Sequence, residues 1–151
     1  MTIDILKEAS KIAEELNTAH IEWAFVGGIA VGIYGFVRAT EDIDIIIKES
    51  DLIEIDKILE KNGFLINESP NIFLDGFKCF RRLKFDQDNS FFMLDILVHS
   101  ELSEKYLKNK IEGKISTIKS YVISKNDLIA MKQKANRPKD HIDIESLKNE
   151  A

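Results

Sequence analysis

The sequence has 151 residues, of which 44% are hydrophobic and 31% are charged, with seven Gly and two Pro. This length suits one domain that can bury a core, and the composition excludes disordered, collagen-like and low-complexity proteins. The net charge of −5 excludes a uniformly basic nucleic-acid-binding surface, although not a local basic patch. The one cysteine, Cys79, excludes an intrachain disulfide and a cysteine-based zinc site, and it fits a reducing compartment.

The longest apolar run, residues 23–37, does not predict a membrane span. It is 15 residues long and contains four glycines, whereas a spanning helix needs about 20 apolar residues. The N-terminus also lacks the basic and apolar regions of a signal peptide. We therefore expect a single cytoplasmic domain over residues 1–151, with no membrane partner.

The first third of the chain alternates between helix and strand patterns. Apolar residues spaced three and four apart predict an amphipathic helix, and the aromatic and β-branched run that follows predicts a strand. A glycine pair ends this strand, and Gly35 is the expected left-handed stop of the short helix after it. In chain order we expect a helix over 3–19, a strand over 21–26, a helix over about 28–34 and a strand over 43–48.

The rest of the chain continues the alternation. Ser50 is the expected N-cap of the next helix, and Asn62-Gly63 is its stop. The turn at 86–90 predicts an antiparallel hairpin. Asn126 is the expected cap of a later helix, and Pro138 suits the first turn of the last one. In chain order we expect a helix over 51–61, strands near 64–66, over 77–85 and over 91–98, a helix over 101–110, a weak strand or extended segment over 114–123, and helices over 126–136 and from Pro138.

These elements predict an α/β (α+β) fold with a mixed sheet of about five strands and flanking helices. The sequence contains no repeat, linker or domain boundary.

Asp42 and Asp44 form the first candidate site. Residues two apart in a strand point to the same face, so the two carboxylates project side by side while Ile43 points away. Two such charges repel unless a cation lies between them, and oxygen donors favour Mg²⁺ or Mn²⁺. Taken alone, the pattern is also compatible with a solvated strand end.

Gly27-Gly28 lies between a predicted strand and a predicted helix. Glycine lets a bulky anion approach the backbone, and the helix start offers free N–H groups and a positive dipole end. This arrangement predicts a phosphate site, with a simple tight turn as the alternative. The glycine spacing fits neither the Rossmann nor the Walker pattern.

Asp95 is a third candidate carboxylate because it interrupts an almost wholly apolar strand over 91–98. A charged residue there must be paired, bound to a metal or at an exposed edge. Asp86 and Asp88, by contrast, suit a turn.

A local cationic cluster lies near the C-terminus. It contains Lys132, Arg137 and Lys139, with Asp140 and Asp143 three residues apart on one helix face. The segment fits either a cationic clamp on a triphosphate, oriented by the aspartates, or a solvated pair of helices linked by ion pairs.

Together these motifs resemble the nucleotidyltransferase superfamily, which shares its minimal fold with DNA polymerase beta. That superfamily has a Gly-Gly or Gly-Ser turn, then Asp-x-Asp, then an Asp on a later strand, matched here by Gly27-Gly28, Asp42/Asp44 and Asp95. The segment from Lys132 to Asp143 resembles the last motif of small AbiEii-type (abortive-infection toxin) nucleotidyltransferases. Two differences are Gly28 in place of Ser and the lack of the C-terminal helical domain of full-length AbiEii-type toxins.

The resemblance implies metal-dependent transfer of a nucleoside monophosphate from an NTP to an acceptor hydroxyl, with release of pyrophosphate. Asp42 and Asp44 would hold two Mg²⁺ (or Mn²⁺) ions, and Asp95 would complete the acceptor-side metal and help deprotonate the hydroxyl. Gly27 and Gly28 would cradle the β- and γ-phosphates. The resemblance also implies that Lys132, with Arg137 or Lys139, offsets the charge of the departing pyrophosphate, oriented by Asp140 and Asp143.

Two other readings stay open. In the first, the domain binds a nucleotide or a partner without turnover. In the second, it is a toxin–antitoxin component that acts on tRNA or on a partner protein. The acceptor itself is unassigned among tRNA, proteins and small molecules. A net negative charge argues against an extended RNA footprint.

Overall fold

The computed structural model describes residues 4–35, 42–66, 71–72, 76–85, 88 and 90–149. The helices and strands alternate largely as predicted. In chain order they are α1 (Ile5–Thr18), β1 (Trp23–Val26), α2 (Gly27–Ile33), β2 (Asp42–Ile47), the 3₁₀ turn η1 (Glu49–Asp51), α3 (Leu52–Lys61), β3 (Asn71–Ile72), β4 (Lys78–Phe85), β5 (Phe91–Val98), α4 (Leu102–Lys108), β6 (Ile111–Ile115), β7 (Ile118–Val122), α5 (Lys125–Ala135) and α6 (Pro138–Lys148).

The strands form one mixed sheet in the order β3-β4-β5-β2-β1-β7-β6. The pairs β2–β5 and β1–β7 are parallel, and the other neighbours are antiparallel. The predicted α/β class with a mixed sheet is confirmed. The sheet places β2 next to β5, so the strands that carry the Asp-x-Asp pair and Asp95 are direct neighbours.

Within the described residues the sheet has seven strands rather than the expected five or so. The segment expected as one extended stretch over 114–123 belongs to a hairpin, in which β6 and β7 turn at Ser116. Ser116 takes a left-handed φ of 55°, and because Ser is not a typical left-handed residue, the sequence does not signal the turn. The expected strand at 64–66 is a single bridge between Leu65 and Leu83.

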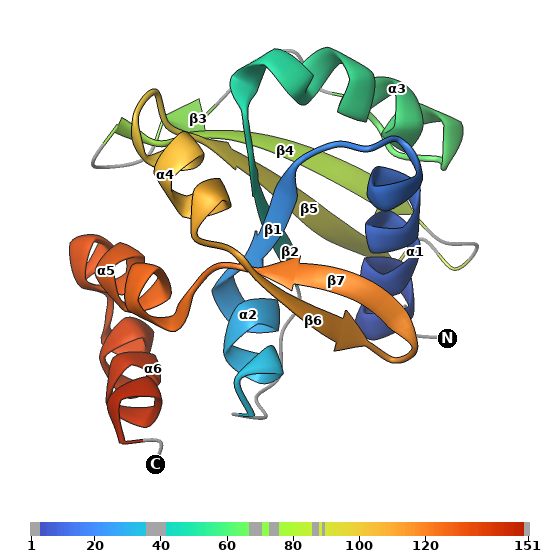
Figure 1. The fold of residues 1–151 in the computed structure, drawn as a ribbon. Helices are drawn as coiled ribbons and strands as arrows, with labels where there is room; N and C mark the ends of the chain where they lie inside the picture. The colour runs from blue at the N-terminus through green and yellow to red at the C-terminus, as the bar shows by residue number, and fades with distance from the viewer. Residues whose placement is uncertain are drawn as a thin grey trace.

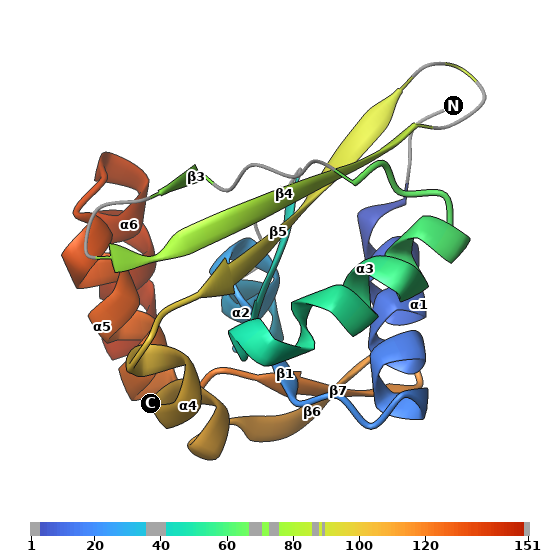
Figure 2. The same ribbon diagram turned by 90° about the horizontal axis from the view of Figure 1, so that it is seen from above.

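Helices cover both faces of the sheet (Figures 1 and 2). Helices α1 and α3 pack on one face, where Trp23, Phe25 and Ile45 belong to the larger apolar core. Helices α4, α5 and α6 contribute Tyr106, Leu128 and other residues to a second core on the opposite face. Strand alternation therefore sends Ile43, Ile45 and Ile47 of β2 into the first core, whereas Asp42, Asp44 and Ile46 point toward the second face.

Two of the predicted helix caps are wrong, and three helix boundaries are right. Ser50 lies inside η1 instead of capping α3, and Ser124, rather than Asn126, caps α5 by accepting a hydrogen bond from the Asp127 N–H. The structure has the predicted positive φ at Gly35 and Gly63, and it places Pro138 at the start of α6. Of the turn predicted at 86–90, Asp86, Gln87 and Asn89 lie outside the described residues.

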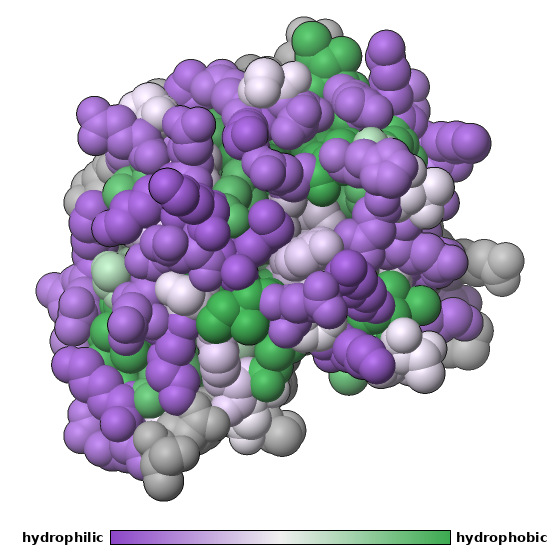
Figure 3. Space-filling view, viewed as in Figure 1, coloured by the Kyte–Doolittle hydropathy of each residue, from purple (hydrophilic) through white to green (hydrophobic). Residues whose placement is uncertain are grey.

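The face shown in Figure 3 is mainly hydrophilic, with apolar side chains in several small patches rather than one broad surface. Among the described residues, no helix has both the length and the apolar character needed to cross a membrane.

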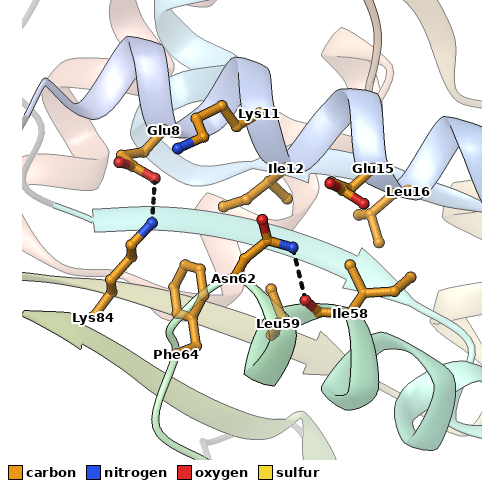
Figure 4. A pocket seen from close by; sticks show the side chains of 10 residues that line it. All are labelled: Glu8, Lys11, Ile12, Glu15, Leu16, Ile58, Leu59, Asn62, Phe64 and Lys84. Atoms are coloured by element: carbon orange, nitrogen blue, oxygen red, sulfur yellow. Dashed lines mark hydrogen bonds and ion pairs between the residues drawn. The ribbon is translucent and has the colours of Figure 1, made fainter.

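A small hollow lies between α1 and α3, on the face away from the aspartates (Figure 4). Lys84 donates to Glu8 across it at 3.3 Å, and the Asn62 amide donates to the Ile58 carbonyl at 2.8 Å. Its volume of about 10 Å³ leaves room for a single water molecule at most. The hollow is therefore part of the packing of the core and has no room for a substrate.

On this same face, Arg82 of β4 is buried and bonded to Asp56 of α3. Its Nε and Nη2 donate to the two carboxylate oxygens at 2.8 and 2.9 Å, and the Arg82 side chain is 2% exposed. A buried guanidinium is stable only with such a partner. The pair ties α3 to the sheet.

Replacing Asp56 by Ala should lower the free energy of unfolding by about 3 kcal/mol, because it leaves the Arg82 charge buried without its carboxylate. Urea unfolding measures the loss, and the double variant Asp56→Leu/Arg82→Met should recover most of it. As a control, Glu112→Gln breaks an exposed ion pair with Lys119 and should leave the unfolding midpoint unchanged. An Asp56→Ala variant as stable as wild type would contradict this role.

Candidate functional site

A cavity of about 410 Å³ lies on the second face of the sheet. This is within the range of small-molecule sites. Its walls come from the β1–α2 junction, from β2, β4 and β5, and from α5 and α6. The lining residues are Val26, Gly27, Gly28, Asp42, Asp44, Phe77, Arg81, Asp95, Leu97, Leu128, Met131, Lys132, Lys134, Ala135, Arg137 and Lys139.

Gly27 and Gly28 form the junction between β1 and α2. Gly27 has a φ of 65° and lies against Asp44, so that a Cβ at residue 27 would come within 2.9 Å of the Asp44 Cγ. Both the left-handed backbone and the close carboxylate require glycine here. Gly28 is buried in the first turn of α2. The turn therefore brings open backbone, rather than side chains, to the edge of the cavity.

Asp42, Asp44 and Asp95 face the same cavity from neighbouring strands. In the register of the sheet, Asp44 lies opposite Asp95 on one side and Val26 on the other. Burial, followed by the charges of Asp95 and Asp42, raises the pKa of Asp44 to about 7. The structure thus concentrates negative charge at one point of the cavity.

Arg81 was not predicted as a site residue, and it contacts Asp95 directly. Its Nε donates to Oδ1 at 2.8 Å and its Nη2 to Oδ2 at 3.0 Å. Asp95 holds the pKa of the guanidinium above its usual value, chiefly through these hydrogen bonds. The signal was present, because a hairpin centred on residue 88 places residue 81 opposite residue 95, as the structure does.

Lys132, Asp140 and Asp143 form a buried cluster between α5 and α6. The Lys132 Nζ lies 2.9 Å from an oxygen of Asp143 and 3.4 Å from one of Asp140, and all three residues are buried. The structure thus brings together the three residues that the sequence groups near the C-terminus. Lys132 still lines the cavity, and its charge opposes the rise in the pKa of Asp44.

Arg137 and Lys139 lie at the exposed rim. The Arg137 Nε donates to Asp140 at 2.7 Å and its backbone N–H donates to the same oxygen at 3.1 Å. Burial favours a higher pKa for Asp140, but the hydrogen bonds from Arg137 outweigh it and lower the pKa. Lys139 is exposed and lines the cavity, and its charge lowers the pKa of Asp44 more than the charge of Lys132 does.

The cavity also has an apolar wall that the sequence did not assign to a site. Phe77, Leu97, Leu128 and Met131 line it beside the charged residues. In the sequence they could not be distinguished from core residues, because each belongs to an apolar strand end or helix stripe. Such a wall suits the flat, weakly polar part of a ligand.

The three carboxylates fit a divalent cation by their chemistry. They supply oxygen donors, which Mg²⁺ and Mn²⁺ prefer. Burial is the main cause of the raised pKa of Asp44, and the negative charges of Asp95 and Asp42 add to it; a cation would relieve this repulsion. In the described ranges, however, no group of three His, Cys, Asp or Glu side chains is assembled as a metal centre. Both Asp95 oxygens are bonded to Arg81 in this arrangement.

Replacing Gly27 by Ala should destabilise the protein by about 2 kcal/mol, because it combines a left-handed backbone with overlap of the new Cβ and Asp44. In an Asp44→Ala background, thermal or urea unfolding should show a smaller cost, since the overlap is relieved. The matched control is Gly32→Ala in the same helix. Its Cβ would meet no atom within 4 Å, so its stability should be equal or slightly higher. Equal effects at both positions would contradict this reading.

Asp44 should make the metal-free protein less stable as the pH rises. Its pKa is raised from 3.8 to about 7 on folding. Between these two pH values the native state keeps a proton that the unfolded chain has lost, so the free energy of unfolding falls as the pH rises. The slope is about 1.4 kcal/mol per pH unit. With EDTA present, the stability advantage of Asp44→Asn over wild type should grow as the pH rises from about 4 to about 7, and then level off. A constant difference between the two proteins would contradict this.

Several solved structures share this fold, and two of the three described here are named as nucleotide-transferring enzymes. LnuA, a lincosamide antibiotic adenylyltransferase solved with lincomycin bound, is 18% identical, with a TM-score of 0.67 over 99% of both chains. A candidate nucleotidyltransferase from Thermotoga maritima is 17% identical, with a TM-score of 0.68 over 97% of this chain and 93% of that chain. ANT(2'')-Ia, solved with adenylyl-2''-tobramycin, is 20% identical, with a TM-score of 0.68 over 94% of this chain and 86% of that chain.

At these identities the likeness establishes the nucleotidyltransferase fold, as the motifs predicted. The sequence matches no curated protein. A family profile does match it across residues 2–148, under the description "nucleotidyltransferase of unknown function". The likeness to AbiEii-type enzymes remains a prediction at the finer level. The chain belongs to this nucleotidyltransferase family, DUF6036.

Proposed function

We propose that the protein transfers a nucleoside monophosphate from an NTP to the hydroxyl group of an acceptor and releases pyrophosphate, with Mg²⁺ or Mn²⁺ as cofactor. The main observation in support is the placement of Gly27 directly against Asp44 in one cavity. Open backbone for phosphate and a paired carboxylate for a cation are thereby combined at one point.

In this proposal Asp42 and Asp44 hold the divalent cations, with Asp95 as the third ligand. When bound, the cations would neutralise charge on the triphosphate and polarise the α-phosphorus. Asp95 lies beside Asp44 on the next strand, so it is the carboxylate to accept the proton of the acceptor hydroxyl.

Gly27 and Gly28 leave room for the phosphates and present backbone N–H groups to them. On the opposite wall Lys139 and Lys132 provide positive charge toward the departing pyrophosphate. Lys132 is held by Asp140 and Asp143, and Arg137 is held by Asp140. Asp140 and Asp143 therefore fix the side chains of Lys132 and Arg137 in place, which limits the reorganisation needed during the reaction.

For the acceptor we propose a small hydroxyl compound ahead of tRNA or protein. The chain spans 99% of LnuA, which is named as an adenylyltransferase of a small antibiotic. The apolar wall of Phe77, Leu97, Leu128 and Met131 lies in the same cavity as the carboxylates. A net charge of −5 also disfavours a long polyanion as the acceptor.

A non-catalytic nucleotide-binding module is the second candidate, favoured by one observation. Arg81 neutralises Asp95 in the described structure, and a domain that kept this pair would bind an NTP without deprotonating an acceptor. A toxin–antitoxin role rests on the AbiEii-type resemblance alone.

The proposal predicts metal-dependent release of pyrophosphate from an α-labelled NTP in the presence of pooled hydroxyl compounds, tRNA and protein acceptors. Asp44→Asn should slow release by roughly 100-fold or more, because it removes the charge that holds the cation. The label should move to the acceptor. Glu112→Gln, an exposed carboxylate on β6, is the matched control and should leave the rate unchanged.

The outcomes separate the candidates. Transfer to a small compound, to tRNA or to protein identifies the acceptor class. NTP binding that needs the metal, without release of pyrophosphate, would favour the binding module. A wild-type protein that binds no NTP in the presence of Mg²⁺ or Mn²⁺ would refute both.

A further inference from the structure

The ion pair between Arg81 and Asp95 occupies the third carboxylate of the site. The two residues lie opposite each other on β4 and β5, and both carboxylate oxygens accept a hydrogen bond from the guanidinium, at 2.8 and 3.0 Å. This bidentate geometry is the strongest form of the arginine–carboxylate interaction. A cation that used Asp95 as a ligand would have to compete with it for the same oxygens.

The two partners differ in their freedom to move. The Asp95 side chain is 7% exposed, whereas the Arg81 side chain is 41% exposed and lines the cavity. Asp95 is fixed within the central part of the sheet, between β4 and β2. Arg81 can therefore leave the pair by rotating its long side chain toward the open cavity, and Asp95 cannot.

Lys132 shows the contrasting case of a fixed cation in the same cavity. Its side chain is 5% exposed and is bonded to Asp140 and Asp143, which are themselves buried. Moving Lys132 would remove the ammonium group that both buried carboxylates share, which is strongly unfavourable. Moving Arg81 uncovers only Asp95, a charge that an incoming cation would compensate.

We propose that Arg81 is an exchangeable counter-ion of Asp95, a positioning residue that gives up this carboxylate when a divalent cation binds. The proposal rests on the proposed function, since it requires a cation site at Asp42, Asp44 and Asp95. Without the cation, Arg81 keeps Asp95 neutralised and oriented. With the cation bound, the guanidinium would turn from Asp95 toward the open cavity that it already lines.

Exchange has a consequence that can be measured without turnover. Because Arg81 and the cation compete for Asp95, removing Arg81 should tighten cation binding, and the gain should depend on Asp95. If Arg81 only repelled the cation from a distance, its removal would tighten cation binding whether or not Asp95 is present. The two effects are separated by a double-mutant cycle.

The experiment measures Mn²⁺ affinity by electron paramagnetic resonance in the absence of nucleotide. Arg81→Met should bind Mn²⁺ on the order of tenfold more tightly than wild type, because a charged, bidentate competitor is gone. In the Asp95→Asn background, Arg81→Met should change the affinity by less than about twofold. Arg81→Lys, which keeps the charge but loses the bidentate fork, should fall between wild type and Arg81→Met.

Lys134→Met is the matched control, because Lys134 is another cation lining the cavity and its replacement removes the same charge. It should alter Mn²⁺ affinity by less than about twofold. Thermal unfolding checks that each variant is folded. If Arg81→Met does not fold, Arg81→Lys still tests the proposal.

Unchanged or weaker Mn²⁺ binding in both Arg81 variants would overturn the proposal, as would a gain that persists in the Asp95→Asn background. These results are distinct from failure of the proposed function. In that case neither wild type nor any Arg81 variant would bind Mn²⁺, with or without an NTP.

Discussion

The crowding of Asp42, Asp44 and Asp95 is the constraint on which the site depends. The pleat of β2 puts the first two on one face, and the parallel pairing of β2 with β5 sets Asp95 beside Asp44. Burial, and then repulsion by Asp95 and Asp42, raise the pKa of Asp44 to about 7. Such an arrangement is unfavourable in a protein selected for stability alone. Under the proposed function, bound divalent cations would offset this cost, and the charges of Lys139 and Lys132 already offset part of it.

Positively charged side chains of three kinds face these carboxylates, and each kind is held differently. Lys132 is fixed by two buried aspartates between α5 and α6. Lys139 is exposed on the first turn of α6, which begins at Pro138 and whose entry is tied down by the Arg137–Asp140 interaction. Arg81 is paired but accessible. This difference in mobility, from fixed to exchangeable, would suit the proposed site, which binds a triphosphate and a metal ion together and later releases both.

Local patterns predicted the elements of this site, but the sheet assembled them. The alternation in β2 was sufficient to place Asp42 and Asp44 on one face, and an isolated charge in an apolar strand was sufficient to single out Asp95. The grouping of Lys132 with Asp140 and Asp143 also followed from their local spacing. Arg81 was missed because its role depends on cross-strand register, and Phe77 and Leu97 were missed because a cavity wall and a core have the same composition. The β6–β7 hairpin was missed because Ser116 occupies a left-handed turn position without Gly or Asn.

The central claim is that one cavity holds metal and triphosphate between the β1–α2 turn and the aspartates. A crystal structure with Mn²⁺ and a non-hydrolysable NTP analogue, with Mn²⁺ located by anomalous scattering, tests it most directly. We expect an anomalous peak coordinated by Asp42 and Asp44, with the phosphates against Gly27-Gly28 and facing Lys139. A triphosphate bound elsewhere, or Mn²⁺ that does not contact these two carboxylates, would contradict it.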